Sequence, residues 1–154
     1  LLRGQLAVMA EQPQQREQVL NYISPGEVFG TLAMLRETPR SATIRVDDAT
    51  REAVLARIDY VFFSNIRDFS VFSLETKLSF YHMLVHNIRW TLEVNRMQDP
   101  DHEVVGLLRK VPMFSGEKGT PAELEALHGQ AHMLAELLCR WNETPAQGGA
   151  MQFT

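Results

Sequence analysis

The chain has 154 residues, of which 45% are hydrophobic and 22% are charged, and this composition argues against a disordered polypeptide. Its 15 basic and 19 acidic residues give a formal charge of −4, so it has no basic field for indiscriminate binding of nucleic acid. The single cysteine, Cys139, excludes an intrachain disulfide and a multi-cysteine zinc site.

The sequence starts at Leu1 rather than at a methionine, and residues 3–8 already have the pattern of a strand inside a sheet. We therefore expect an excerpt from a larger regulator whose beginning is missing. No apolar run approaches the roughly 18 residues that a membrane span needs, so we expect no contact with a membrane and a cytoplasmic location.

The first elements form a predicted hairpin. Leu6 and Val8 alternate with small or polar neighbours, and residues 18–23 resume a strand-like run after a polar stretch. Residues 24–27, Ser-Pro-Gly-Glu, predict a tight turn, because proline presets its second position and glycine accepts a positive φ at its third. Two more alternating runs, 42–46 and 53–58, predict further antiparallel strands of a small barrel or jelly roll.

The pattern changes to helical at about Asp59. Residues 60–66 have the spacing of a short helix, and residues 71–98 predict a long amphipathic one that Asp99 and Pro100 end. A helix of about 28 residues is about 40 Å long, at 1.5 Å per residue, and exceeds the width of a small β domain. We therefore expect homodimerisation through its apolar stripe.

The last third predicts two more helices. Residues 103–110 form a short one, and residues 120–123, Thr-Pro-Ala-Glu, are a capping box for a second. Residues 144–149 end this second helix. Its predicted apolar face consists of Leu124, Leu127, Ala131, Leu134 and Leu138.

A candidate anion site lies between these regions. Gly30 removes a side chain where the backbone leaves a strand and opens a short helix, whose first N–H groups and dipole suit an anion. Arg40 adds a guanidinium fork, and Ser41 and Ala42 leave room for a ligand beside a hydroxyl donor. The alternative for Arg40 is a surface ion pair with Glu37 or Asp47.

Residues 28–44, VFGTLAMLRETPRSATI, resemble the phosphate-binding cassette of the cyclic-nucleotide-binding domain family, the family of the catabolite activator and of protein kinase A regulatory subunits. The resemblance covers residues 1–98. It implies a fold that is mainly β with α: an eight-stranded jelly-roll barrel followed by short and long helices, with the nucleotide between cassette and long helix. The matching cassette residues are Phe29, Gly30, Leu32, Ala33, Pro39, Arg40, Ser41, Ala42 and Thr43.

The resemblance implies a ligand site that needs no other cofactor. Thr31 stands where the family has a glutamate that accepts a hydrogen bond from the ribose 2′-hydroxyl. Hydrogen bonds to charged groups are worth about 1.5–3 kcal/mol, so we expect an affinity for cyclic AMP (cAMP) about 10- to 150-fold lower. Asn95 and Arg96 fall near the positions that contact the base, with a solvated helix face as the alternative. The predicted ligand residues are Phe29, Gly30, Thr31, Leu32, Ala33, Arg40, Ser41, Ala42 and Asn95.

Residues 99–154 have two interpretations. Residues 107–127 resemble the helical segment that precedes the barrel in the same family, so they are predicted to begin a second sensor domain. The alternative compares residues 131–140 with the helix that leads into the winged helix of activator-type transcription factors. These residues contain no recognition helix, so nucleic acid is expected to bind only through a domain outside this chain.

Two histidine pairs, His82/His86 and His128/His132, have the i, i+4 spacing of a zinc motif, but no carboxylate or cysteine completes a set at ligand spacing. We interpret them as surface or interface residues and expect no catalysis. The predicted function is a regulatory domain that senses a cyclic nucleotide, cAMP or cyclic GMP (cGMP), or a related phosphate. The alternatives are a ligand-free dimerisation module of the same fold and the sensor half of a transcription regulator.

Overall fold

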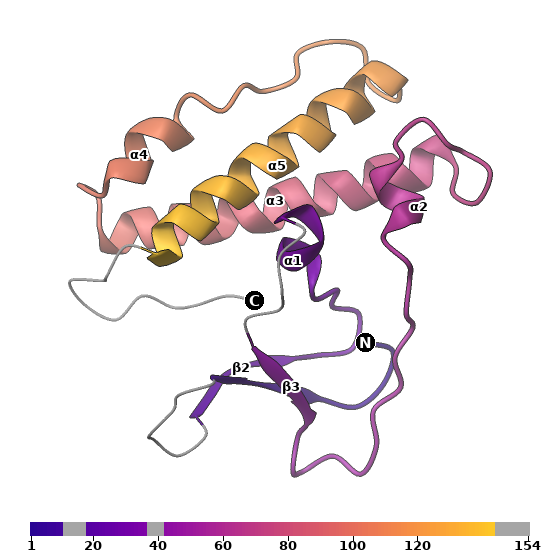
Figure 1. Ribbon diagram of the computed structural model, residues 1–154, viewed down its shortest axis with the longest axis vertical. Coiled ribbons are helices and arrows are strands. Elements are labelled where there is room, and N and C mark those ends of the chain that lie inside the picture. Colours follow the sequence, from indigo (N-terminus) through magenta and orange to yellow (C-terminus); the bar gives the residue numbers. More distant parts are fainter. Residues whose placement is uncertain (11–17, 37–41, 144–154) are drawn as a thin grey trace. The chain divides into compact units, whose positions relative to one another are not determined.

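The structure is a computed structural model that describes residues 1–10, 18–36 and 42–143 (Figure 1). The chain divides into two compact units. The first, Leu1–Ile58, is the sheet unit, and the second, which begins at Asp59, is the helical unit. This division falls earlier than residue 98, where the sequence places the end of its first segment. That segmentation stays a prediction.

The sheet unit contains a three-stranded antiparallel sheet in the order β2-β1-β3. The central strand β1, Leu6–Ala10, pairs on one side with β2, Gln18–Ile23, and on the other with β3, Thr43–Val46. The register shifts between Val8 and Met9, where β1 and β2 form a bulge or irregularity. The predicted hairpin and the predicted strand at 42–46 are confirmed.

The core of the sheet unit lies on the alternating side chains of its two first strands. Leu6 and Val8 of β1 and Ile23 of β2 are buried together with Leu1. Full burial of such an aliphatic side chain contributes about 1.5–3 kcal/mol, so this cluster stabilises the sheet unit.

The predicted barrel is not what the described residues form. Strands β1, β2 and β3 are the strands that the structure gives for residues 1–10, 18–36 and 42–143, and the helices there hold more residues than the strands. The prediction of a strand at 53–58 is wrong: this stretch keeps one isolated bridge, between Arg3 and Val54. That prediction rested only on the alternation of apolar and polar residues. A strand also needs a neighbouring strand that continues the ladder of backbone hydrogen bonds.

The helical unit begins with a short aromatic-rich helix, α2, Val61–Ser64. The Phe63 ring stacks on those of Phe72 and Phe80, with centroids 4.7 and 4.0 Å away. The hydroxyl of Tyr81 donates to the carbonyl oxygen of Phe63 over 3.2 Å, and burial raises the pKa of Tyr81 to about 12. These contacts hold α2 against the first turns of the long helix.

The long helix α3, Leu74–Gln98, confirms the predicted one apart from its first three residues. Ser73 caps its first turn, because its hydroxyl accepts the N–H of Thr76 at 3.2 Å. Asp99, before Pro100, has left the helical region with φ −134° and ψ 83°, as expected for a residue that precedes proline.

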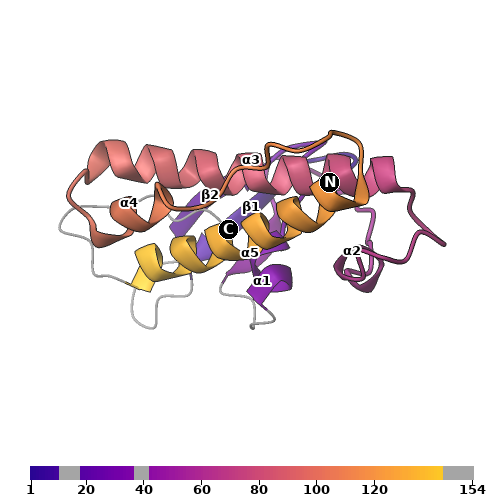
Figure 2. The same cartoon turned by 90° about the horizontal axis from the view of Figure 1, so that it is seen from above.

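Two further helices follow, α4, Glu103–Leu108, and α5, Pro121–Glu143. Helices α3 and α5 lie side by side and run in the same direction, so the segment between α4 and α5 must run back along them (Figure 1, Figure 2). Gln130 of α5 holds this return segment through a hydrogen bond from its side-chain amide to the carbonyl oxygen of Pro112, over 2.5 Å.

The apolar stripe of α3 packs on α5 within the same chain. This is a correction to the reason given for dimerisation, because the stripe that was expected to need a partner is already covered. The buried side chains on the two helices include Leu78, Tyr81, Leu84, Val85, Ile88 and Leu92 of α3, and Leu124, Leu127, Ala131, Leu134, Ala135 and Leu138 of α5.

Candidate functional site

A tight turn carries the chain from β2 into the candidate site. The N–H of Glu27 donates to the carbonyl oxygen of Ser24 over 3.1 Å, and the N–H of Ser24 donates to the Glu27 carboxylate over 2.6 Å. Gly26 has φ 93°, the left-handed region that its position in the turn requires. The predicted Ser-Pro-Gly-Glu turn is confirmed, and it sets where the cassette starts.

Two predicted ligand residues pack beside the core. Phe29 and Ala42 are half-buried and lie against the cluster of Leu1, Leu6, Val8 and Ile23. Phe29 precedes the candidate helix and Ala42 precedes β3. They therefore tether the two ends of the cassette to the core of the sheet unit, and their contact with a ligand stays a prediction.

Gly30 opens the candidate helix as predicted. Its φ is 77°, which strongly favours glycine, and α1, Thr31–Arg36, follows at once. The N–H of Met34 donates to the carbonyl oxygen of Gly30 over 3.2 Å, so the N–H groups of residues 31–33 precede the first bond of the helical ladder. Thr31, Leu32 and Ala33 are half-buried. The backbone N–H groups of this turn are the donors that the sequence predicts for an anionic group, and their contact with a ligand stays a prediction.

Three predicted ligand residues remain, Arg40, Ser41 and Asn95. Arg40 and Ser41 lie outside the described residues, so their roles stay predictions. Asn95 belongs to the helical unit, where it is 2% exposed. Arg96 forms an ion pair with Glu93, with 2.8 Å between nitrogen and oxygen.

Residues 1–68 match the family model of the cyclic nucleotide-binding domain. The match covers less than half of the chain, and it supports a cyclic nucleotide-binding domain over these residues. The match contains the whole cassette, from Phe29 to Thr43, and it supports a ligand-sensing regulatory role for the domain. The searches of curated proteins and of solved structures gave no match.

The matched segment ends ten residues into the helical unit. Helix α3 and everything after it lie outside the matched residues. Among the described residues, no helix is both long enough and apolar enough to cross a membrane.

Both histidine pairs of the sequence have partners in the helical unit. The Nε2 atom of His82 lies 3.1 Å from a carboxylate oxygen of Glu123, and the Nε2 atoms of His128 and His132 lie 3.2 Å apart. Burial, and then the neighbouring His132, lower the pKa of His128. No group of three or more His, Cys, Asp or Glu side chains in the described part of the chain could hold a metal ion.

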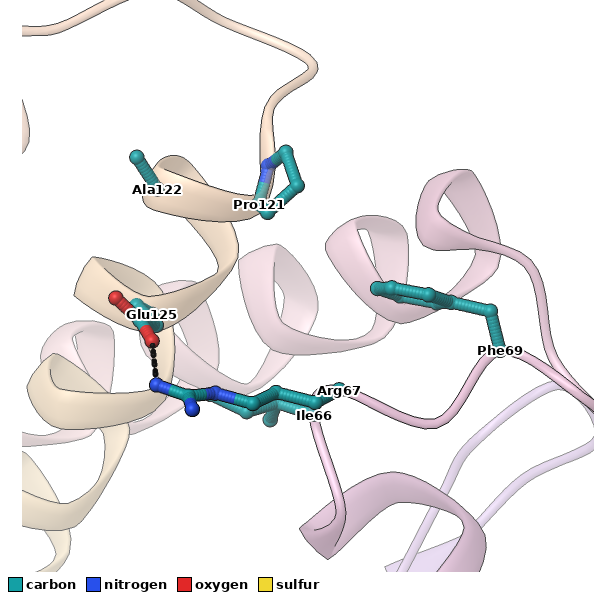
Figure 3. Close-up of a pocket in the computed structure, with 6 residues that line it drawn as sticks. All are labelled: Ile66, Arg67, Phe69, Pro121, Ala122 and Glu125. Atoms are coloured by element: carbon teal, nitrogen blue, oxygen red, sulfur yellow. Dashed lines mark hydrogen bonds and ion pairs between the residues drawn. The ribbon is translucent and has the colours of Figure 1, made fainter.

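A pocket that the sequence did not indicate lies at the start of α5. It has a volume of about 330 Å³, and Figure 3 shows its residues on two segments, the loop after α2 and the first turns of α5. Arg67 reaches across to Glu125, with 2.9 Å between the charged atoms. Both side chains are exposed, so the ion pair adds little stability. The lining residues are Ile66, Arg67, Phe69, Pro121, Ala122 and Glu125.

Proposed function

We propose that the cyclic nucleotide-binding domain binds cAMP, cGMP or a related phosphate in its cassette and acts as a non-catalytic regulator. The observation that carries the proposal is Gly30, whose left-handed conformation opens α1 with three backbone donors ahead of its ladder. Arg40 follows ten residues later and supplies the positive charge. Binding repositions α3 and so changes an attached effector or a dimer interface.

The proposal is tested by calorimetry with cAMP and cGMP on the parent chain and on Arg40→Ala. The loss of one hydrogen bond to a charged phosphate lowers affinity about 10- to 150-fold, and the loss of a bidentate pair lowers it more. Arg36→Ala is the matched control, because Arg36 is an exposed arginine at the end of α1. The expected result is loss of binding in Arg40→Ala alone. Equal affinity in the parent and Arg40→Ala would show that the phosphate binds elsewhere.

We also propose that the chain forms a homodimer through a second face of α3. Trp90 is 62% exposed and Met97 is 66% exposed, and Met83 lies seven residues before Trp90 on the same face. Residues seven apart line one side of a helix, so these side chains form an apolar row that suits a second copy.

Sedimentation measures this dimer directly. Trp90→Glu places a charge in the row and is expected to give a monomer, whereas Met113→Glu, in the return segment, leaves the mass unchanged. If Trp90→Glu still sediments as a dimer, this face of α3 is not the dimer interface. A dimer that binds no cyclic mono- or dinucleotide would favour the ligand-free dimerisation module instead.

A further inference from the structure

Helix α5 carries two imidazole rings that face each other. His128 and His132 are one helical turn apart, their Nε2 atoms are separated by 3.2 Å, and their ring centroids by 4.5 Å. The ring planes are inclined at 57°, so the rings are not stacked. At this distance one Nε2 atom donates a hydrogen bond to the other, and both offer a lone pair once each ring carries its proton on Nδ1.

This separation matches the spacing of two ligands on one metal ion. Histidine nitrogens bind zinc at about 2.0–2.1 Å, and two such bonds to atoms 3.2 Å apart enclose an angle of about 100° at the ion. This angle lies between the right angle of octahedral coordination and the tetrahedral angle. An ion that binds both nitrogens replaces the hydrogen bond between the two rings.

One of the two rings is already held in place. The Tyr81 ring meets the His128 ring in a T-shaped contact, with centroids 5.3 Å apart. Tyr81 is itself buried, and its hydroxyl is bound to the Phe63 carbonyl oxygen. A ligand whose orientation is fixed by packing loses less entropy on binding. His132 is exposed, so an ion reaches the pair from solvent.

We propose that His128 and His132 form a two-histidine site for a divalent transition-metal ion such as Zn²⁺ or Ni²⁺. Imidazole suits these ions, whereas Mg²⁺ and Ca²⁺ prefer oxygen ligands. The described residues offer no third side-chain ligand, so water fills the remaining positions. A site with open positions exchanges its ion and can accept a ligand from another molecule, unlike a closed structural zinc site.

The second histidine pair is the matched control. His82 and His86 have the same spacing on α3, but the Nε2 atom of His82 is directed to the Glu123 carboxylate, 3.1 Å away. This pair is therefore expected not to bind the ion. Cys139 is half-buried on α5 and is replaced by serine in every protein tested, because a thiol also binds zinc.

The test is calorimetry of the whole chain with zinc chloride and with nickel chloride, in the Cys139→Ser background. We expect one ion per chain and an affinity at least about tenfold lower in His132→Ala, since even an outer partner of a metal ligand is worth about 10- to 100-fold. The His82→Ala/His86→Ala double variant is expected to bind as tightly as the parent.

Melting temperatures separate loss of the site from loss of the fold. His128→Ala also removes a packing partner of Tyr81, whereas His132 is exposed, so His132→Ala decides the question. Either ion is expected to raise the melting temperature of the parent and not that of His132→Ala, because only the native pair binds it. Unchanged affinity in His132→Ala, loss of binding in the His82/His86 variant, or no binding by the parent would overturn the proposal.

Discussion

The Nε2 atom of His82 on α3 lies 3.1 Å from a carboxylate oxygen of Glu123 on α5. The Glu123 side chain also accepts the N–H of Gly119 at 2.7 Å and lies 3.2 Å from the Lys118 amine. One carboxylate therefore joins α3, the first turn of α5 and the segment before it. The predicted capping box is half confirmed: the Thr120 hydroxyl accepts the Glu123 N–H, but the carboxylate binds Gly119.

Acid is expected to weaken this junction. The hydrogen bond from Gly119, and then Lys118, hold the pKa of Glu123 below its usual value of 4.5 against the opposing effect of burial. A lowered carboxylate pKa stabilises the fold above the unfolded value, and this stability is lost as the pH falls through the folded value. Glu123→Gln is thus expected to melt at a lower temperature than the parent at pH 7.

The pH profile of melting checks this. The difference between parent and Glu123→Gln should shrink steadily below about pH 4.5, where protonation removes the same charge from the parent. Glu125→Gln, two residues on and exposed, is the control and should change little at any pH. A difference that stays constant down to strongly acidic pH would mean that the charge of Glu123 is not what stabilises α5.

Substitutions at two glycines of the sheet unit distinguish the cost of a left-handed backbone from the cost of steric crowding. Both have a positive φ, 87° at Gly4 and 93° at Gly26. A β-carbon at Gly4 would lie 2.5 Å from the carbonyl oxygen of Glu52, whereas one at Gly26 would meet nothing within 4 Å. Gly26→Ala is expected to cost about 1–2 kcal/mol, the cost of a left-handed residue, and Gly4→Ala distinctly more. Urea denaturation measures both, and equal losses would contradict the crowding at Gly4.

The buried amide of Asn95 is expected to lower stability. Neither its nitrogen nor its oxygen has a hydrogen-bond partner in the described structure, and the side chain is 2% exposed. An unsatisfied buried polar group costs about 1–3 kcal/mol, so Asn95→Leu, which has the same branching and the same number of side-chain heavy atoms, should raise the free energy of unfolding by about 1 kcal/mol or more. Thr91→Val on the same helix is the control, because the Thr91 hydroxyl has a partner, the carbonyl oxygen of Asn87 at 3.0 Å.

Calorimetry on the same variants addresses the predicted contact between Asn95 and the base. If Asn95 contacts the nucleotide when the ligand binds, Asn95→Leu will be more stable than the parent and will bind cAMP more weakly than the parent does. Greater stability with unchanged affinity would assign to Asn95 a role inside the helical unit alone. Lower stability would mean that the amide has a partner in solution.

The sequence predicted the elements that depend on interactions between residues close in the chain. The hairpin, the Ser-Pro-Gly-Glu turn and the end of α3 at Gln98 all follow from spacing and from proline and glycine, and all are confirmed. The packing of α5 on the α3 stripe was missed, because it joins residues more than forty positions apart, such as Tyr81 and His128, and periodicity does not identify the partner of a stripe. Helix α3 carries two apolar rows, the buried stripe and the row of Met83, Trp90 and Met97. The sequence does not show which of the two rows packs within the chain.

The candidate site divides in the same way. Gly30 was predictable because few other residues adopt its conformation, and its φ of 77° confirms the expected break before α1. Asn95 was placed by resemblance alone, although it lies three residues after Leu92 and seven after Ile88, on the buried stripe. That spacing predicts the burial that the structure shows and argues against the alternative of a solvated helix face, while the contact with the base stays a prediction.

Thr31 stands where the family pattern has a glutamate, and Thr31→Glu tests whether this position sets the affinity for cAMP. Thr31 is the first residue of α1, where an added carboxylate also meets the favourable end of the helix dipole. If a glutamate there accepts a hydrogen bond from the ribose 2′-hydroxyl, affinity for cAMP should rise about tenfold or more. Thr31→Gln, of equal length but neutral, should gain less.

Calorimetry with 2′-deoxy-cAMP identifies the contact. This nucleotide lacks the hydroxyl, so Thr31→Glu should bind it no more tightly than the parent does, while its affinity for cAMP rises. An equal gain for both nucleotides would assign the effect to stabilisation of α1 rather than to the ribose. No gain for either would mean that the selection of a ligand rests on residues other than Thr31, because a carboxylate at the start of α1 would then be out of reach of the sugar.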